Sequence, residues 1–343
     1  MEQLKLRTYE IEDKFLSEFA CKSAGEHKRQ RPEEPCRMRT DFQRDRDRII
    51  YCNSFRRLKN KTQVFFSPEG DHYITRLTHT LDVAQIARSL ARCLALNEDL
   101  AEAIALGHDL GHTPFGHSGE RILNNLSGGR FKHNVQSRRV VEVLEKDGEG
   151  LNLTYEVRDG IENHKKDGNP KTLEARCVSQ ADRIAYINHD IEDAMRAGIL
   201  CREDIPRDII EVLGDGSGKR INTAISSIYS YSYGRNAVEM DPVVDKASED
   251  LRNFMFNNVY LTRTVRAEEE KAERMLTEMF NYYKHHFDAV PAEYKKHLSD
   301  KDCDDVTVIV DYISSMTDRY AICEFNRIFV PHGWLFMDEK HTV

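Results

Sequence analysis

The sequence predicts a globular, mostly α-helical protein, and two observations support that prediction. Apolar residues recur three and four positions apart through most of the chain, which is typical of the buried faces of helices. Hydrophobic residues make up 40% and charged residues 31% of the 343 residues, a composition that can bury a core without disulfides. The expected helices cover, in chain order, residues 41–58, 78–96, 99–112, 118–126, 135–146, 155–164, 174–198, 260–286 and 304–329.

The segments between these helices suggest how the chain is divided. Residues 20–38 are polar, contain two prolines and lack periodicity, so we expect an exposed loop or lid. β-forming residues around a Pro-Glu-Gly break predict a short extended segment or hairpin at 61–74. We therefore expect N-terminal helices with an arginine-rich segment in residues 1–60, a core in residues 61–200, and a C-terminal helical region in residues 201–343 packed on that core.

Charge and cysteine usage narrow the class of protein. A net charge of −8 argues against a protein that coats nucleic acid. The eight cysteines are scattered without a CxxC pair, so we expect reduced thiols. The N-terminal residues resemble no signal peptide, and no stretch approaches eighteen apolar residues, so we expect a cytoplasmic protein without a membrane partner.

The stretch from Arg37 to Arg57 is rich in arginine and has two interpretations. It could contact phosphates, or its arginines could pair with the interleaved Asp41, Asp45 and Asp47 on an exposed helix. The sequence leaves both open.

The run AIALGHDLGHTPFGHSGE concentrates titratable side chains in a segment that otherwise reads as a buried helix. It places His108, Asp109, His112, His117 and Glu120 within thirteen residues. Imidazole and carboxylate groups suit a divalent transition metal, and an adjacent His-Asp pair can converge on one ion.

Two more polar residues interrupt the apolar patterns of other helices, His79 before this run and Asp182 after it. Each histidine alone would usually be a satisfied core residue, and Asp182 an ion-pair partner. Together, His79, His108, Asp109 and Asp182 predict a four-ligand site for one divalent ion. Because thiolates are absent and water ligands have room, we interpret the ion as catalytic rather than structural.

The order H…HD…D is the signature of the HD superfamily of metal phosphohydrolases, and the likeness extends further. In order from Arg39 to Ala321, the blocks RTDFQRDRDRIIYCNSFRRLKNKTQVF, RLTHTLDVAQIA, GHDLGHTPFGHSGE, FKHNVQSRR, ADRIAYINHDIEDA and SSMTDRYA resemble the deoxynucleoside triphosphate triphosphohydrolase (dGTPase) family. The resemblance implies a helical HD-domain fold with additional C-terminal helices. It also implies hydrolysis of a dNTP to the deoxynucleoside and inorganic triphosphate, with one Mn²⁺, Mg²⁺, Co²⁺ or Fe²⁺ ion per chain.

Catalysis requires a group that protonates the leaving 5′-oxygen. His117 is the best candidate, because Glu120 lies three residues on, on the same helix face, and can hold the ring. These positions match the family's catalytic His-Glu pair. His112 and His133 match family positions near the phosphates, although either could instead orient a metal ligand.

The resemblance also implies a set of substrate contacts. Arg76 and Arg183 match positions that face the α-phosphate and the polyphosphate, where guanidinium groups suit bidentate contact. Tyr186 and Asp190 follow Asp182 along one helix stripe and resemble the sugar site, with Gln63 at its edge. Residues 201–300 contain no recognisable block, so the preferred base stays open.

Two rival functions remain. One is a different HD phosphohydrolase, acting on nucleoside monophosphates or cyclic nucleotides. The other is a nucleic-acid-responsive regulator that keeps an HD fold. The family resemblance and the long amphipathic helices after residue 250 further predict a homo-oligomer, with a nucleotide or single-stranded DNA as a candidate effector.

Overall fold

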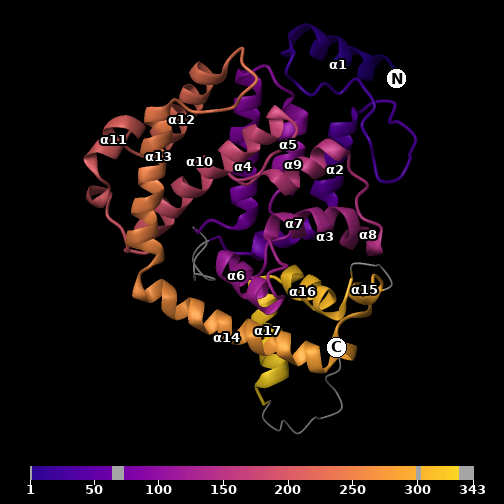
Figure 1. Cartoon of the computed structure of the whole chain (residues 1–343), viewed down its shortest axis with the longest axis vertical. Helices are drawn as coiled ribbons and strands as arrows, with labels where there is room; N and C mark the ends of the chain where they lie inside the picture. Colours follow the sequence, from indigo (N-terminus) through magenta and orange to yellow (C-terminus); the bar gives the residue numbers. More distant parts are fainter. Residues whose placement is uncertain (1, 64–72, 299–302, 332–343) are drawn as a thin grey trace, which may run out of the picture.

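A computed structural model describes residues 2–63, 73–298 and 303–331, and over these residues the fold is helical, as the sequence predicts (Figure 1). The helices are α1 (Glu2–Phe15), α2 (Asp41–Tyr51), α3 (Asn53–Arg57), α4 (Arg76–Cys93), α5 (Glu98–Gly107), α6 (Gly116–Leu126), α7 (His133–Arg139), α8 (Glu145–Gly148), α9 (Tyr155–Asn163), α10 (Leu173–Arg196), α11 (Arg207–Leu213), α12 (Ser217–Ser232), α13 (Pro242–Met255), α14 (Arg263–His285), α15 (Ala292–Lys295), α16 (Asp305–Ser315) and α17 (Asp318–Phe329).

The main core lies between α2, α4, α5, α9 and α10, which pack together at the centre of the molecule (Figure 1). Their facing sides are lined by small and branched apolar residues, so the helices approach closely. Thr75 closes a capping box at the start of α4, and Asn97 and Thr172 cap α5 and α10 with their side chains. Because these caps fix where each helix begins, they also fix which side chains face the next helix.

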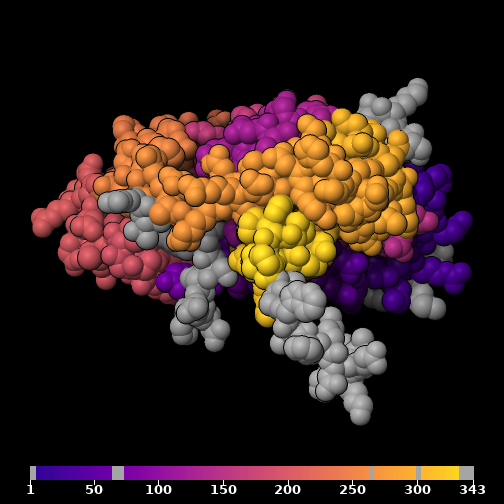
Figure 2. Space-filling view, turned by 90° about the horizontal axis from the view of Figure 1, so that it is seen from below, coloured from indigo at the N-terminus to yellow at the C-terminus, as the bar shows by residue number. Residues whose placement is uncertain are grey.

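The second half of the chain packs on this core through two smaller clusters. One joins α10 to α11 and α13, and the other joins α6 to α14, α16 and α17. Seen from below, α14 crosses the underside of the molecule with α17 against it (Figure 2). None of the described helices combines the length and the apolar character needed to cross a lipid bilayer. All eight cysteines are described and carry free thiols.

Three expected helices are interrupted in the structure. The 41–58 pattern breaks at Cys52, the 304–329 pattern breaks at Thr317, and the 135–146 pattern passes through a π-helical turn at Val140–Leu144. Cys52 and Thr317 each cap the following helix with their side chains, so local capping ends a pattern that apolar spacing alone would continue.

The extended segment expected at 61–74 falls mainly outside the described residues. Its flanks, Thr62 and Thr75, form an antiparallel bridge. This bridge brings Gln63 next to the first turn of α4.

Candidate metal centre and active site

Two of the predicted metal ligands lie on helices and two in a turn. His79 lies one turn into α4 and Asp182 lies on α10, whereas His108 and Asp109 follow each other in the turn directly after α5. Both α5 and α10 pack against α4, so the side chains meet at one point although Asp182 is 103 positions from His79.

The donor atoms lie close enough to surround one ion. His79 Nε2 lies 3.1 Å from Asp182 Oδ1, and His108 Nε2 lies 3.4 Å from Asp109 Oδ1. Two separations are longer than ideal, since His79 Nε2 is 3.9 Å from Asp109 Oδ2 and His108 Nε2 is 3.8 Å from Asp182 Oδ1. Ligands about 2.1 Å from a metal and about 90 to 110° apart are separated by roughly 3.0–3.4 Å. The cluster is therefore near the size that a divalent ion requires.

His108 provides an independent test of this fit. Its Nδ1 lies 2.6 Å from the Ala105 carbonyl oxygen, so Nδ1 carries the proton and Nε2 presents a lone pair. That Nε2 is buried and has no hydrogen-bond partner among the described residues. A buried acceptor without a partner costs about 1–3 kcal/mol, which a bound cation would remove.

Asp109 stays ionised in this buried place. Burial alone would raise its pKa, but His108, His112 and the ion pair from Arg76 Nη1 at 2.8 Å outweigh burial and hold the pKa of Asp109 well below its usual value. The carboxylate is thus ready to bind a cation.

Two residues that the sequence analysis did not select orient His79. His79 Nδ1 lies 3.3 Å from His189 Nδ1, and His189 Nε2 lies 2.9 Å from Asp82 Oδ2. If His189 donates Nε2–H to Asp82, its Nδ1 accepts from His79, and His79 Nε2 is left free for the ion. Asp82 follows His79 by three residues on α4, a spacing that could have drawn attention to it.

We expect His189→Ala to weaken divalent metal binding by about 10- to 100-fold, because the His79 ring loses the partner that fixes its orientation. Asp82→Asn should act in the same direction. Titration of the divalent ion into metal-depleted protein, with the heat measured by calorimetry, gives the affinity for the ion. His285→Ala, at an exposed histidine of α14, is the matched control. Unchanged affinity in His189→Ala would contradict the role.

Glu120 joins two of the predicted imidazoles. Its Oε2 lies 3.6 Å from His117 Nδ1 and 2.8 Å from His133 Nδ1, and its Oε1 accepts from the His133 backbone N–H at 2.9 Å. Burial favours the neutral carboxyl, but these contacts outweigh burial and lower the pKa of Glu120. His112 stacks on His133 with ring centroids 4.0 Å apart. The His117 side chain is 71% exposed, whereas His133 is buried.

Two adjoining cavities, of about 310 and 400 Å³, form one cleft beside these residues. Gln63, His117, Tyr186 and Arg252 line both. The smaller cavity is also lined by the predicted residues Arg76, His79, Asp109, His112, His133, Asp182 and Arg183, and the larger by Asp190. Of the predicted site residues, His108 and Glu120 lie behind the walls, where they contact residues that line them.

Arg76 and Arg183 of the cleft differ in how far their guanidinium groups are already paired. Arg76 is 1% exposed, and its Nε and Nη2 have no hydrogen-bond partner in the described part of the chain. Arg183 instead forms an ion pair with Asp245 of α13 at 3.2 Å. Asp190 accepts a hydrogen bond from Tyr260, a residue that the sequence analysis did not select.

The turn that carries Asp109 is held in place from the C-terminal region. Lys61 Nζ is buried and donates to the carbonyl oxygens of His112 and Ser314. At Gly111 a Cβ would lie 2.2 Å from the Ser137 backbone N, so only glycine allows the turn to pack on α7.

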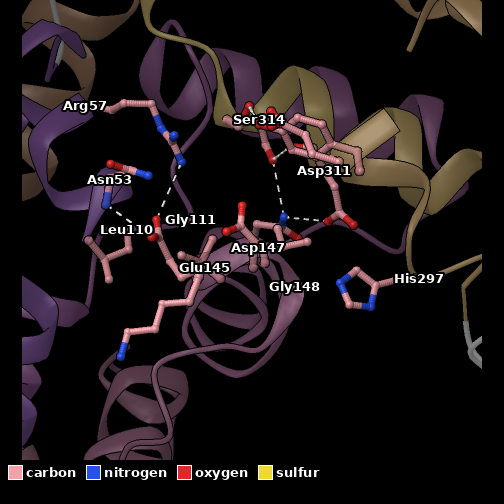
Figure 3. Close-up of a pocket in the computed structure, with 17 residues that line it drawn as sticks. Asn53, Arg57, Leu110, Gly111, Glu145, Asp147, Gly148, His297, Asp311 and Ser314 are labelled. Carbon is pink, nitrogen blue, oxygen red and sulfur yellow. Dashed lines mark hydrogen bonds and ion pairs between the residues drawn. The ribbon is translucent and has the colours of Figure 1, made fainter. Parts of the chain in front are cut away.

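A further cavity, of about 100 Å³, is lined in part by Leu110 and Gly111 and is shown in Figure 3. Two of its carboxylates are already paired within the protein: Glu145 accepts from the backbone N–H groups of Asn53 and Ser54, and Asp311 pairs with Arg139. We therefore treat this cavity as part of the scaffold.

Comparisons with known proteins agree with this geometry. The HD domain family model matches residues 76–187, and the phosphohydrolase-associated domain model matches residues 238–327. A deoxyguanosinetriphosphate triphosphohydrolase-like protein of Caldanaerobacter subterraneus subsp. tengcongensis is 54% identical over 327 residues, covering 95% of this chain and 96% of the relative. Proteins of the same description from Desulfatibacillum aliphaticivorans and Clostridium perfringens are 49% and 46% identical, each over 92% of this chain and 95% and 94% of the relative.

The fold, the cluster and the family model together define an HD-domain phosphohydrolase. Within that class, the chain belongs to the deoxyguanosinetriphosphate triphosphohydrolase-like family, which confirms the resemblance seen in the sequence.

Proposed function

We propose that this protein hydrolyses deoxynucleoside triphosphates to the deoxynucleoside and inorganic triphosphate. The observation that carries the proposal is the single cleft that runs from the His-Asp cluster past Tyr186 to Asp190. Cationic and imidazole groups line one end, and Phe115, Phe256 and Tyr260 line the other. A polyphosphate fits the first end and a nucleoside the second.

At the phosphate end, Arg76 is built to bind an anion. It is buried, one guanidinium nitrogen is committed to Asp109, and the other two are without partners among the described residues. Lys165 adds positive charge to the same cavity, and Lys166, which pairs with Glu249, also lines it. A divalent ion held by His79, His108, Asp109 and Asp182 would neutralise charge on the α-phosphate oxygens.

His117 is the proposed general acid. Its ring lines both cavities, so it lies where the phosphate end meets the nucleoside end, next to the expected position of the 5′-oxygen. The Glu120 carboxylate lies 3.6 Å from His117 Nδ1 and can hold the orientation of the ring. His133 is a poorer candidate, because burial lowers its pKa and its Nδ1 is committed to Glu120.

The sugar site follows from Tyr186 and Asp190. If the deoxyribose packs on the Tyr186 ring, a 2′-hydroxyl would lose water without gaining a partner, at a cost of roughly 1–3 kcal/mol. The Asp190 carboxylate would accept a hydrogen bond from the 3′-hydroxyl, in addition to the one that it accepts from the Tyr260 hydroxyl.

We expect the protein to prefer dNTPs over NTPs by about ten- to a hundredfold in kcat/KM. Tyr186→Ala should weaken this preference by relieving the clash, whereas Tyr186→Phe keeps the ring and should retain it. Asp190→Asn should weaken use of both sugars. Competition of dGTP and GTP in one reaction measures the ratio of their kcat/KM values. Equal hydrolysis of the two by the wild type would show that the sugar does not bind against Tyr186.

The activity itself is tested by separating the products of each dNTP under Mg²⁺, Mn²⁺ and Co²⁺. Release of triphosphate supports the proposal. Release of pyrophosphate or phosphate, or turnover only of monophosphates or cyclic nucleotides, would favour another HD phosphohydrolase. The absence of turnover with every nucleotide would favour the regulator.

The arginine-rich segment gives the regulator little support. Between Arg37 and Arg57, Arg44 and Arg48 form ion pairs with Glu33, Arg39 pairs with Asp47, and Arg46 pairs with Asp47 and Asp99. These guanidinium groups are therefore occupied within the protein. On the strength of the family resemblance, the proposal also includes a homo-oligomer and a nucleotide or DNA effector. It keeps the division of the chain into three regions at residues 60 and 200.

A further inference from the structure

A second group of metal-type ligands lies where the segment after α1 passes α9. The Cys21 thiol, a His27 ring nitrogen and a Glu156 carboxylate oxygen all lie within 4.8 Å of one another. We propose that these three side chains bind a transition-metal ion of the zinc type, at a site separate from the HD cluster. Sulfur, imidazole and carboxylate together are a donor set that Zn²⁺ and Co²⁺ favour.

Backbone contacts bring these ligands together. The Cys21 N–H donates to Glu174 Oε1 at 2.9 Å, which ties this part of the segment to α10. The Tyr155 N–H donates to the Lys28 carbonyl oxygen at 2.8 Å, which ties the next part to the start of α9. The side chains therefore converge without depending on contacts with one another, as a preformed site requires.

Burial alone would lower the pKa of His27, but Glu156 outweighs burial and raises it. A bound ion would therefore replace the proton of this pair, whose geometry is poor for a hydrogen bond. His27 Nδ1 lies 3.2 Å from Glu156 Oε1, and the His27 side chain is 6% exposed. Within the described ranges, neither ring nitrogen nor Glu156 Oε2 has a hydrogen-bond partner of good geometry. Ligands about 2.0–2.1 Å from a tetrahedral ion are separated by roughly 3.3 Å, which matches the observed distance.

The surrounding charge favours a cation. Burial, and after it the carboxylates of Glu174, Glu156 and Glu12, raise the pKa of the Cys21 thiol, and burial raises the pKa of Glu174 and Glu12 in turn. Glu174 is fully buried, and its Oε2 has no hydrogen-bond partner among the residues that the structure describes. When a divalent ion binds, the thiol proton leaves to solvent and the ion takes its place beside these carboxylates. The ion would fasten the segment between α1 and α2 to the core.

Co²⁺ is the probe that separates the two sites. Thiolate-to-Co²⁺ charge transfer absorbs in the near ultraviolet, and the four HD ligands include no thiolate. We expect this band in full-length wild-type protein loaded with Co²⁺ and in Asp109→Ala. Cys21→Ser should lose the band, while Cys36→Ser, which alters another cysteine of the same segment, should keep it.

If circular dichroism shows that Cys21→Ser is unfolded, His27→Gln replaces it in the test. His27→Gln should weaken Co²⁺ binding, followed by the same band, by at least about tenfold. No band in the wild type, a band that survives in folded Cys21→Ser, or an unchanged affinity in His27→Gln would overturn the proposal. His27 and Glu156 would then form only an ion pair.

Discussion

Asp109→Ala is expected to lower the divalent metal content of the purified protein by about one ion per chain and to abolish turnover. Asp109 supplies a carboxylate to the cluster. Among the described residues, it is also the only one that forms an ion pair with Arg76. Its removal therefore takes away a ligand and leaves a buried guanidinium without its counterion.

Elemental analysis of protein purified without chelators measures the metal, and circular dichroism checks that the variant is folded. Asp13→Ala, at an exposed carboxylate paired with Lys22, is the matched control and should keep its metal. The Cys21 site predicts that a second ion, where present, persists in Asp109→Ala. Full retention of metal in Asp109→Ala together with its loss in Cys21→Ser would show that the HD cluster is not the metal centre.

His117→Ala is expected to keep both metal and substrate affinity but to lose turnover by about 10²–10⁴-fold, the usual contribution of a general acid. Because the His117 side chain is 71% exposed, added imidazole should enter the vacated space and restore part of kcat. Glu120→Gln should lower kcat less, since the imidazole remains.

Steady-state kinetics with the preferred dNTP separates kcat from KM in these variants. His286→Ala, at a histidine remote from the cleft on the far end of α14, controls for loss of any imidazole. An unchanged kcat in His117→Ala would transfer the role to another imidazole of the cluster. His112 comes first: burial lowers the pKa of both His112 and His133, but His133 Nδ1 is committed to Glu120, whereas His112 Nδ1 has no hydrogen-bond partner among the described residues.

The sequence by itself determined the helical class and the residues of the candidate metal cluster. Apolar spacing identifies which face of a helix is buried, so polar residues on that face, such as His79 and Asp182, stand out. The adjacent His108 and Asp109 needed no long-range information either, since neighbouring positions are close in any fold. The family blocks added the expected roles of His117 and Glu120 and the proposed substrate contacts.

The tertiary structure alone decided which groups support those residues. Asp82 and His189 are 107 positions apart, Asp190 and Tyr260 are 70 apart, and Lys61 reaches the carbonyl oxygen of Ser314 across 253. Local periodicity cannot predict such pairs, because a hydrogen bond depends on how whole helices pack and on side-chain rotamers.

Packing also decided the state of the charged groups. Arg76 and Arg183 look equivalent in the sequence, yet one has guanidinium nitrogens without partners and the other is paired with Asp245. Cys21, His27 and Glu156 have no motif spacing, and only the passage of the segment after α1 beside α9 brings them within ligand distance. A charge or a ligand set becomes defined only when the fold fixes its neighbours and excludes water.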